Sequence, residues 1–319
     1  MRKLFAALVV AALLGGGVYA YFQLWHKPST RDGDCPDDAP VFTATQPTGL
    51  RRYNVVAIDP ETGKATRLTK DGASWDAAVS PAGDQIVFES GREGIWSEAG
   101  AFEASSLYIM DEDGSNRRRL VPGTHNEDPA WSPDGKWIAF ARSAEGGDQG
   151  GIFIVRPDGT KMRRVVHSIS RESYHSPTWA PDGKRIAYVA TTGSLGNGTI
   201  NVTQIGEESF YEAMTSFHAY ITNLDWSPDG ERLVFDVLGE NPTTGIYTIT
   251  PENGTPELLF PNGKSPVWSP DGTRVAYFSG RGEGPFHLSV QDPSGRRRVD
   301  LPPAYEFDGA LEDISWTRC

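Results

Sequence analysis

One short phrase recurs along the chain at nearly regular intervals. The segment AWSPDGKWIAFAR begins at Ala130, and weaker copies place Val79 and Trp316 at the position of its tryptophan. Related segments begin at Thr178, Asp225 and Val267. The six copies lie 42 to 52 residues apart, which is long enough for a four-stranded unit and too long for an ankyrin or tetratricopeptide repeat. The repeat therefore predicts an array of β units.

Each unit predicts the same four strands. A short apolar strand ends at the tryptophan, and SPDG forms a tight turn in which proline and glycine take the positions that they favour. Segments such as WIAFA and RIAYV are rich in β-forming residues and follow as the second strand. A third strand such as SLYIMD leads through a glycine hairpin into a polar fourth strand. The chain has 35 Gly and 23 Pro, which suits many short strands and turns.

The two ends of the repeat region complete one another. VFTAT at Val41 fits a second strand, and NVVAIDPETGKATRLT fits a third and a fourth strand. DISWT near the C-terminus fits the missing first strand. The fold class predicted is therefore all-β, a six-bladed β-propeller whose closing blade combines three N-terminal strands with one C-terminal strand. Ring closure protects sheet edges, and the anchor tryptophans are expected to fill the space between neighbouring blades.

The repeated phrase, followed by a hairpin of the LYIMDEDGSNRRRL type, resembles the TolB-like β-propeller repeat family. The resemblance covers residues 41–317 and implies the fold. It implies little about function, since the family includes periplasmic proteins that bind partners in envelope complexes, propellers fused to serine peptidases and a few carbohydrate lyases. The chain lacks the N-terminal α/β domain of TolB, so TolB's own partners are not carried over.

The N-terminus predicts a targeting segment. Arg2 and Lys3 precede an uncharged stretch from Leu4 to Trp25, long enough to cross a bilayer. We assign residues 1–27 to a signal-anchor or signal peptide, 28–39 to a linker and 40–319 to the propeller. An uncleaved membrane anchor is favoured, which makes the propeller extracytoplasmic. Cleavage after Ala20 is the alternative and would give a secreted or periplasmic protein.

The two cysteines flank the propeller and predict a disulfide. They are Cys35 and Cys319. In the closing blade the C-terminal strand ends beside the start of its N-terminal neighbour, so these two ends must lie close together. An exported chain meets an oxidising compartment, where such a pair forms a bridge.

Several classes of function are disfavoured. The net charge of −12 argues against nucleic-acid binding, which needs a positive field. The sequence has no G-x-S-x-G elbow, H-E-x-x-H motif, P-loop or cysteine cluster, and no cofactor is predicted. A monomer is expected.

Polar and aromatic residues in the loops that enter each first strand are expected to converge on the mouth of the central channel. These residues are Trp75, Asp76, His125, Asp128, Tyr174, His175, His218, Asn223 and Asp313. The long segment 90–105 adds Trp96 and Phe102, which can serve a partner or cover the neighbouring blade. Taken singly, each polar residue also fits a purely structural role, in which it satisfies loop backbone groups.

The predicted function is a non-enzymatic binding or protein-interaction scaffold of the cell envelope, with an envelope protein or a glycan as its ligand. The alternative is a metal-dependent carbohydrate-active enzyme, such as a polysaccharide lyase, in which channel histidines hold a divalent metal.

Overall fold

The computed structural model describes residues 41–47, 51–58, 65–91, 105–123, 125–143, 150–167, 172–192, 197–206, 210–214, 219–239, 244–252, 254–280, 287–294, 298–300 and 311–315. Across these ranges the regular elements are β-strands, and no helix long and apolar enough to cross a membrane occurs among them. The predicted N-terminal membrane segment and both cysteines lie outside these ranges.

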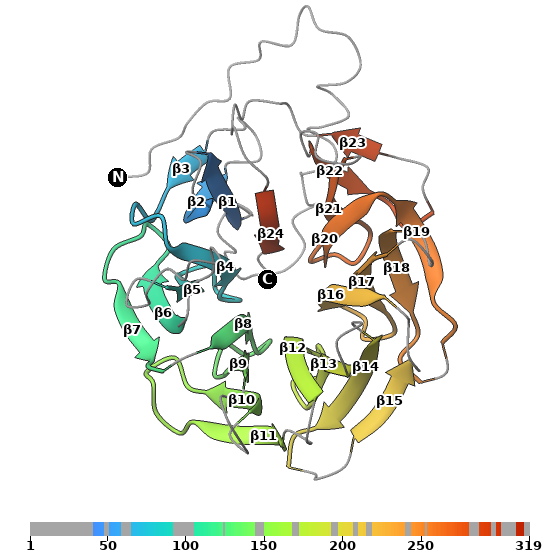
Figure 1. Cartoon of the computed structure of the whole chain (residues 1–319), viewed down its shortest axis with the longest axis horizontal. Coiled ribbons are helices and arrows are strands. Elements are labelled where there is room, and N and C mark those ends of the chain that lie inside the picture. The colour runs from blue at the N-terminus through green and yellow to red at the C-terminus, as the bar shows by residue number, and fades with distance from the viewer. Residues whose placement is uncertain are drawn as a thin grey trace, which may run out of the picture.

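The protein is an all-β propeller. Five four-stranded antiparallel sheets, here called blades 1 to 5, surround a central axis with the first strand of each innermost (Figure 1). Blades 1 and 2 contain β4 (Ser74–Val79), β5 (Gln85–Ser90), β6 (Ser106–Asp111), β7 (Arg118–Val121), β8 (Asn126–Trp131), β9 (Ile138–Arg142), β10 (Gly151–Val155) and β11 (Arg163–His167). Blade 3 contains β12 (Glu172–Trp179), β13 (Arg185–Thr192), β14 (Asn197–Gln204) and β15 (Phe210–Met214). Blades 4 and 5 contain β16 (Tyr220–Trp226), β17 (Leu233–Leu238), β18 (Gly245–Ile249), β19 (Glu257–Pro261), β20 (Gly263–Trp268), β21 (Val275–Ser279), β22 (His287–Gln291) and β23 (Arg298–Asp300).

A further sheet joins the two ends of the described chain. Its strands are β1 (Val41–Pro47), β2 (Arg51–Ile58), β3 (Ala65–Arg67) and β24 (Leu311–Ser315), in the order β24-β1-β2-β3. Val41 pairs with Ser315 and Phe42 with Ile314 in antiparallel register. β24 contacts β4 on one side and β20 on the other, so the sheet lies between blades 1 and 5 (Figure 1).

The SPDG turns connect first and second strands through a repeated set of hydrogen bonds. In blade 4 the Ser227 hydroxyl donates to Asp229 Oδ1 at 2.5 Å and accepts from the Arg232 backbone N–H at 2.9 Å. Gly230 has φ +75, a conformation that glycine adopts without strain. The bond from Ser227 lowers the pKa of Asp229 below its usual value, so the carboxylate stays charged and keeps its turn closed.

The anchor tryptophans pack between blades, as the sequence predicts. Trp179, Trp226 and Trp268 are almost fully buried. Trp131 is half-buried, and its Nε1–H donates to the Ala78 carbonyl of the preceding blade at 3.0 Å. Because each ring covers the blade before it, the first strands are held at fixed positions around the axis.

Candidate functional site at the channel mouth

Every first strand in blades 1 to 5 carries a bulge at the same repeat position. The register with the second strand shifts there, and one non-glycine residue takes a positive φ. These residues are Asp76 (φ 45), Asp128 (φ 53), Ser176 (φ 50), Asn223 (φ 46) and Ser265 (φ 51). Asp and Asn tolerate this conformation best among residues with a side chain. A β-bulge re-aims the side chain that it carries, so the repeat places one polar group per blade near the axis.

A cavity of about 180 Å³ occupies the central channel. Four bulge residues, Asp76, Asp128, Ser176 and Asn223, contribute to its lining, and so do apolar residues farther along the same strands. The first strands begin at the mouth and end at the SPDG turns, so the cavity runs from the bulges toward the turn face. It therefore combines a polar level with apolar walls, the usual composition of a ligand site.

A second cavity of about 190 Å³ lies between blades 1 and 2 at the mouth. Its lining residues are Trp75, Asp76, Glu89, Ser105, His125, Glu127 and Asp128. His125 Nδ1 lies 3.8 Å from Glu127 Oε1. Burial raises the pKa of Glu127, the Asp128 charge raises it further, and His125 opposes both effects. The cavity is thus strongly acidic, with an indole on one wall.

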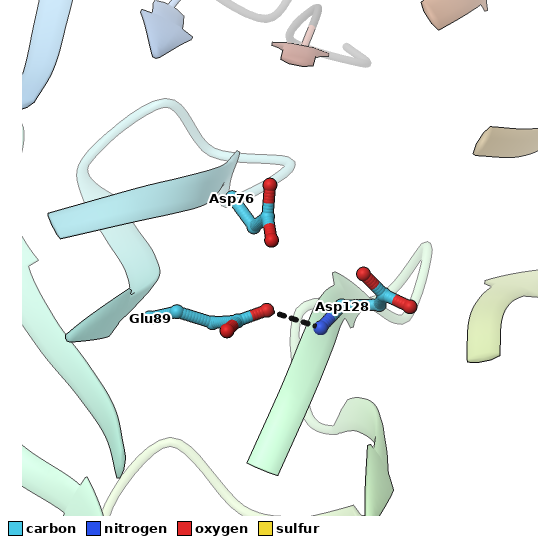
Figure 2. A group of neighbouring side chains, drawn as sticks. All are labelled: Asp76, Glu89 and Asp128. Atoms are coloured by element: carbon cyan, nitrogen blue, oxygen red, sulfur yellow. Dashed lines mark hydrogen bonds between the residues drawn. The ribbon is translucent and has the colours of Figure 1, made fainter. Parts of the chain in front are cut away.

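Three carboxyl groups meet in this second cavity (Figure 2). Ligand oxygens of Asp76, Glu89 and Asp128 all lie within 4.8 Å of one another. The Asp76 carboxylate points toward Glu89, and Glu89 Oε1 accepts the Asp128 backbone N–H at 2.7 Å. Glu89 is only 1% exposed, and burial, followed by the nearby Asp128 charge, raises its pKa well above the usual value. This raised pKa favours the protonated form of Glu89.

This cluster of three carboxyl groups also limits which ligands the site can hold. Three oxygen donors suit a hard cation such as Ca²⁺ or Mg²⁺, but six or more ligands are usual for these ions. Among the described residues this is the one group of His, Cys, Asp and Glu side chains close enough to share a metal, and it contains no histidine. We assign no metal to it.

Hydrogen bonds connect the bulges of neighbouring blades. Asp128 Oδ2 accepts the Ser176 backbone N–H at 2.6 Å, which ties blade 2 to blade 3. His175 Nε2 lies 2.9 Å from Thr191 Oγ1 within blade 3. Burial lowers the pKa of His175, and the charge of Asp128 partly offsets this. His175 therefore favours the neutral form and fills a structural position beneath the bulge.

A second buried carboxylate plays the same connecting role in blade 4. Asp236, which is 1% exposed, accepts the Ser265 backbone N–H of blade 5 at 2.8 Å. It also accepts hydrogen bonds from Thr222 Oγ1 at 2.5 Å and Asn223 Nδ2 at 3.3 Å. Glu89 and Asp236 occupy equivalent positions in their second strands.

Sequence reasoning missed Glu89 and Asp236, although a signal was present. The equivalent residues of blades 2, 3 and 5 are Ala141, Val189 and Phe278. An acidic residue at a repeat position that is otherwise apolar marks a local departure from the core pattern. Ser176 was also missed, because the neighbouring residue His175 was predicted to lie at the mouth in its place.

The structure brings together some of the predicted mouth residues. Trp75, Asp76, His125 and Asp128 line the second cavity, and Asn223 lines the central one. Most of these residues lie within first strands, whereas the sequence places them in the loops that enter those strands. Tyr174 is 5% exposed in the core of blade 3, and its hydroxyl donates to Glu172 Oε2 at 2.6 Å. Trp96, Phe102 and His218 lie outside the described residues, and of Asp313 only its place in β24 is described.

Comparison with known proteins matches the same repeat. A family model described as the TolB beta propeller domain matches residues 154–300. An uncharacterised protein of Agrobacterium fabrum is 32% identical over 117 residues, covering 36% of this chain and 36% of its own length. The Tol-Pal system protein TolB of Francisella tularensis subsp. mediasiatica is 28% identical over 238 residues, covering 70% of this chain and 53% of its own.

Structural comparison agrees on the fold. The crystal structure of TolB from Acinetobacter baumannii superposes with a TM-score of 0.71 at 20% identity, covering 90% of this chain and 68% of that one. The chain spans 36 to 53% of the length of the relatives that it matches by sequence.

Proposed function

Because the chain belongs to the TolB-like β-propeller repeat family, we propose that it is a non-enzymatic binding scaffold whose partner, an envelope protein or a glycan, docks at the channel mouth. The observation that carries this proposal is the convergence of polar bulge residues from successive blades on one concavity. Asp76, Asp128, Ser176 and Asn223 come from four blades and line one cavity. A repeat scaffold that presents one variable polar group per blade suits recognition of a partner.

The proposal includes a ring closed by a sixth blade. The sheet β24-β1-β2-β3 supplies this blade, and its contacts with β4 and β20 support closure. By its position before Trp316, Asp313 is the sixth-blade equivalent of Asp76 and Asp128. A closed ring of six would hold the mouth residues rigidly, which lowers the entropy cost of binding.

Location is proposed from the N-terminal sequence, and covalent closure from the strand pairing of the sixth sheet. The N-terminal segment anchors the protein, and the propeller lies outside the cytoplasmic membrane. The pairing of Val41 with Ser315 leaves Cys35 and Cys319 only a few residues beyond two neighbouring strand ends, which supports a Cys35–Cys319 disulfide.

The rival proposal, a metal-dependent carbohydrate-active enzyme, receives less support. It requires imidazoles that converge on one metal. His175 is buried against Thr191, and His125 faces Glu127 at the cavity wall. Neither histidine belongs to the cluster of three carboxyl groups that could share an ion. Binding without catalysis therefore accounts better for the described residues.

Capture of a partner from the native envelope tests the proposed function. The bait is the full chain, and the variant is Asp76→Asn with Asp128→Asn, which removes two charges while keeping shape and tolerance of positive φ. The control is Glu112→Gln with Glu231→Gln, an equal charge change at exposed positions on the turn face. We expect the first variant to lose about tenfold or more in affinity, since each charged hydrogen bond contributes roughly 1.5–3 kcal/mol. Equal capture by both variants, at equal melting temperature, would rule out the mouth.

A further inference from the structure

Arg142 stands at a repeat position where the fold requires no charge. It is the last residue of β9, and the equivalent residues in the other blades are small or apolar. They are Ser90, Ala190, Val237 and Ser279. β9 ends at the mouth, because its partner β8 begins there and ends at the SPDG turn. A guanidinium at this place is therefore a feature of this chain and not of the repeat.

The side chain is held in one orientation by its surroundings. The guanidinium carbon lies 4.8 Å from the ring centre of Phe153 and 5.6 Å from that of Phe140. Nε–H donates to Asn126 Oδ1 at 2.7 Å. Burial lowers the pKa of Arg142, although an arginine remains charged at any physiological pH. Ring stacking and the Nε bond fix the plane of the fork, so little side-chain entropy is left to lose on binding.

The fixed cation faces no carboxylate among the residues that the structure describes. Some other arginines there do have such partners. Arg117 Nη1 lies 2.8 Å from Asp71 Oδ2, and Arg185 Nε lies 2.8 Å from Asp182 Oδ2. The side-chain acceptor that Arg142 meets is the neutral amide of Asn126. In a chain of net charge −12, a half-buried arginine with a neutral partner leaves its two terminal nitrogens available for an anion.

Glycines leave space beside those nitrogens. A Cβ on Gly123 would lie 4.0 Å from Arg142 Nη2, and Gly151 pairs directly with Arg142 across the sheet. Arg164 flanks Gly151 from the other side, with its Cδ 3.3 Å from the position of a Gly151 Cβ. Arg164 Nη1 donates to the Gly150 carbonyl at 3.4 Å. Two guanidinium side chains thus border a patch in which the glycines leave the backbone uncovered by side chains.

We propose that Arg142 binds a carboxylate of the partner protein, with Arg164 adding positive potential at the same patch. The planar fork matches a carboxylate with two parallel hydrogen bonds. This inference rests on the proposed function and names the chemistry of one contact within it. The ligand group is an Asp or Glu side chain, or a C-terminal carboxylate, presented singly.

The neighbouring charges favour a protein over an acidic polysaccharide. Asn126, the partner of Arg142, is followed directly by Glu127 and Asp128, which line the acidic cavity on the same face. A polyuronate would place further negative charges beside that cavity and be repelled. A protein segment can instead present one carboxylate to Arg142 and donor groups to the cavity.

Nuclear magnetic resonance of the full chain with ¹⁵N-labelled arginine tests the inference. The Arg142 Nε–Hε signal is assigned by its loss in Arg142→Lys. The probes are the blocked tripeptide Gly-Glu-Gly, its Gly-Gln-Gly counterpart and trigalacturonate. We expect the Glu peptide to shift this signal saturably with a dissociation constant of about 1–10 mM, a range that corresponds to roughly 3–4 kcal/mol. Arg142→Lys, whose binding is followed by the backbone amide shifts of neighbouring residues, should weaken binding about tenfold. Arg163→Gln, which removes another guanidinium near a ring, should leave binding unchanged.

Each outcome decides the point. An absent or unsaturable shift, or an equal shift with the Gln peptide, overturns the carboxylate site. A stronger response to trigalacturonate than to the Glu peptide overturns the assignment to a protein. If the wild type captures an envelope partner and Arg142→Gln captures it equally, the inference fails while the proposed function stands. If the peptide binds but the wild type captures nothing, the proposed function fails instead.

Discussion

Replacing Asp236 with alanine is expected to destabilise the propeller through the joint between blades 4 and 5. The carboxylate is 1% exposed and accepts three hydrogen bonds, from Ser265 N–H, Thr222 Oγ1 and Asn223 Nδ2. Thr222 and Asn223 are half-buried and can turn toward water. Ser265 is 4% exposed, and its backbone N–H has no such freedom. Ser265 also has a positive φ of 51, which is uncommon for a residue with a side chain.

The magnitude follows from these three bonds. A buried donor left without an acceptor costs about 1–3 kcal/mol, and each lost bond to a charged acceptor adds up to a similar amount. Removal of a buried charge returns part of this cost. We therefore expect Asp236→Ala to lower the free energy of unfolding by about 3–5 kcal/mol. At about 2 °C per kcal/mol for a domain of this size, the melting temperature should fall by roughly 6–10 °C.

Calorimetry and urea denaturation measure the change, with Asp236→Asn and Asp158→Ala for comparison. The asparagine keeps an oxygen for the Ser265 amide, so its cost should be about half that of alanine. Among the described residues Asp158 accepts bonds from Thr160 alone, in an exposed hairpin, and its removal should cost under about 1 kcal/mol. A loss below about 1 kcal/mol for Asp236→Ala, or equal losses for all three variants, would refute the view that this carboxylate connects the blades.

Two further predictions concern Glu89 and Gly151. The pKa of Glu89 is higher in the folded protein than in the unfolded chain, where it is 4.5, so the folded protein holds this proton more tightly. The stability that this group contributes is therefore present below about pH 4.5 and is lost as pH rises through the raised pKa. Glu89→Gln stays neutral, so its melting temperature should rise relative to wild type as pH increases from 4.5, and a pH-independent difference would contradict this. Gly151→Ala would place a Cβ 2.0 Å from the Val166 carbonyl oxygen, at φ +140, and should cost about 2–4 kcal/mol. Gly183→Ala, where nothing lies within 4 Å, should cost about 1 kcal/mol, and equal losses in melting temperature would show that the clash is relieved.

The repeat predicted the fold because the residues that form each turn lie within one short stretch of sequence. Each SPDG phrase contains its own serine, aspartate and glycine, and the turn closes through bonds within that phrase. The tryptophan before it packs on the preceding blade in every described copy where it occurs. Local signals of this kind survive in a single sequence, since no distant residue is needed to interpret them.

The site was less predictable because its contacts join residues from different blades. Asp128 was selected from sequence as a polar residue near a first strand, but its partner Glu89 lies 39 positions away and its partner Ser176 lies 48 away. Tyr174 carried the same surface signal as its neighbours, yet its side chain points into the core, because alternate residues of a strand face opposite sides. The one-residue shift at each bulge changes that alternation, and nothing in the local sequence marks it except an Asp, Asn or Ser that tolerates positive φ.

Comparing equivalent positions of the blades also separates residues that differ from the repeat pattern for a structural reason from those that differ for a functional one. Glu89 and Asp236 both replace apolar residues, and each carboxyl group accepts a backbone N–H of the next blade, so both are satisfied inside the fold. Arg142 also replaces a small or apolar residue, but its fork meets no such partner among the described residues. A departure that the fold itself satisfies explains rigidity at the mouth, whereas a departure that it leaves unsatisfied points outward to a ligand. On this argument we propose that the acidic second cavity and the Arg142 patch form two halves of one recognition surface, which would fit a partner of mixed charge.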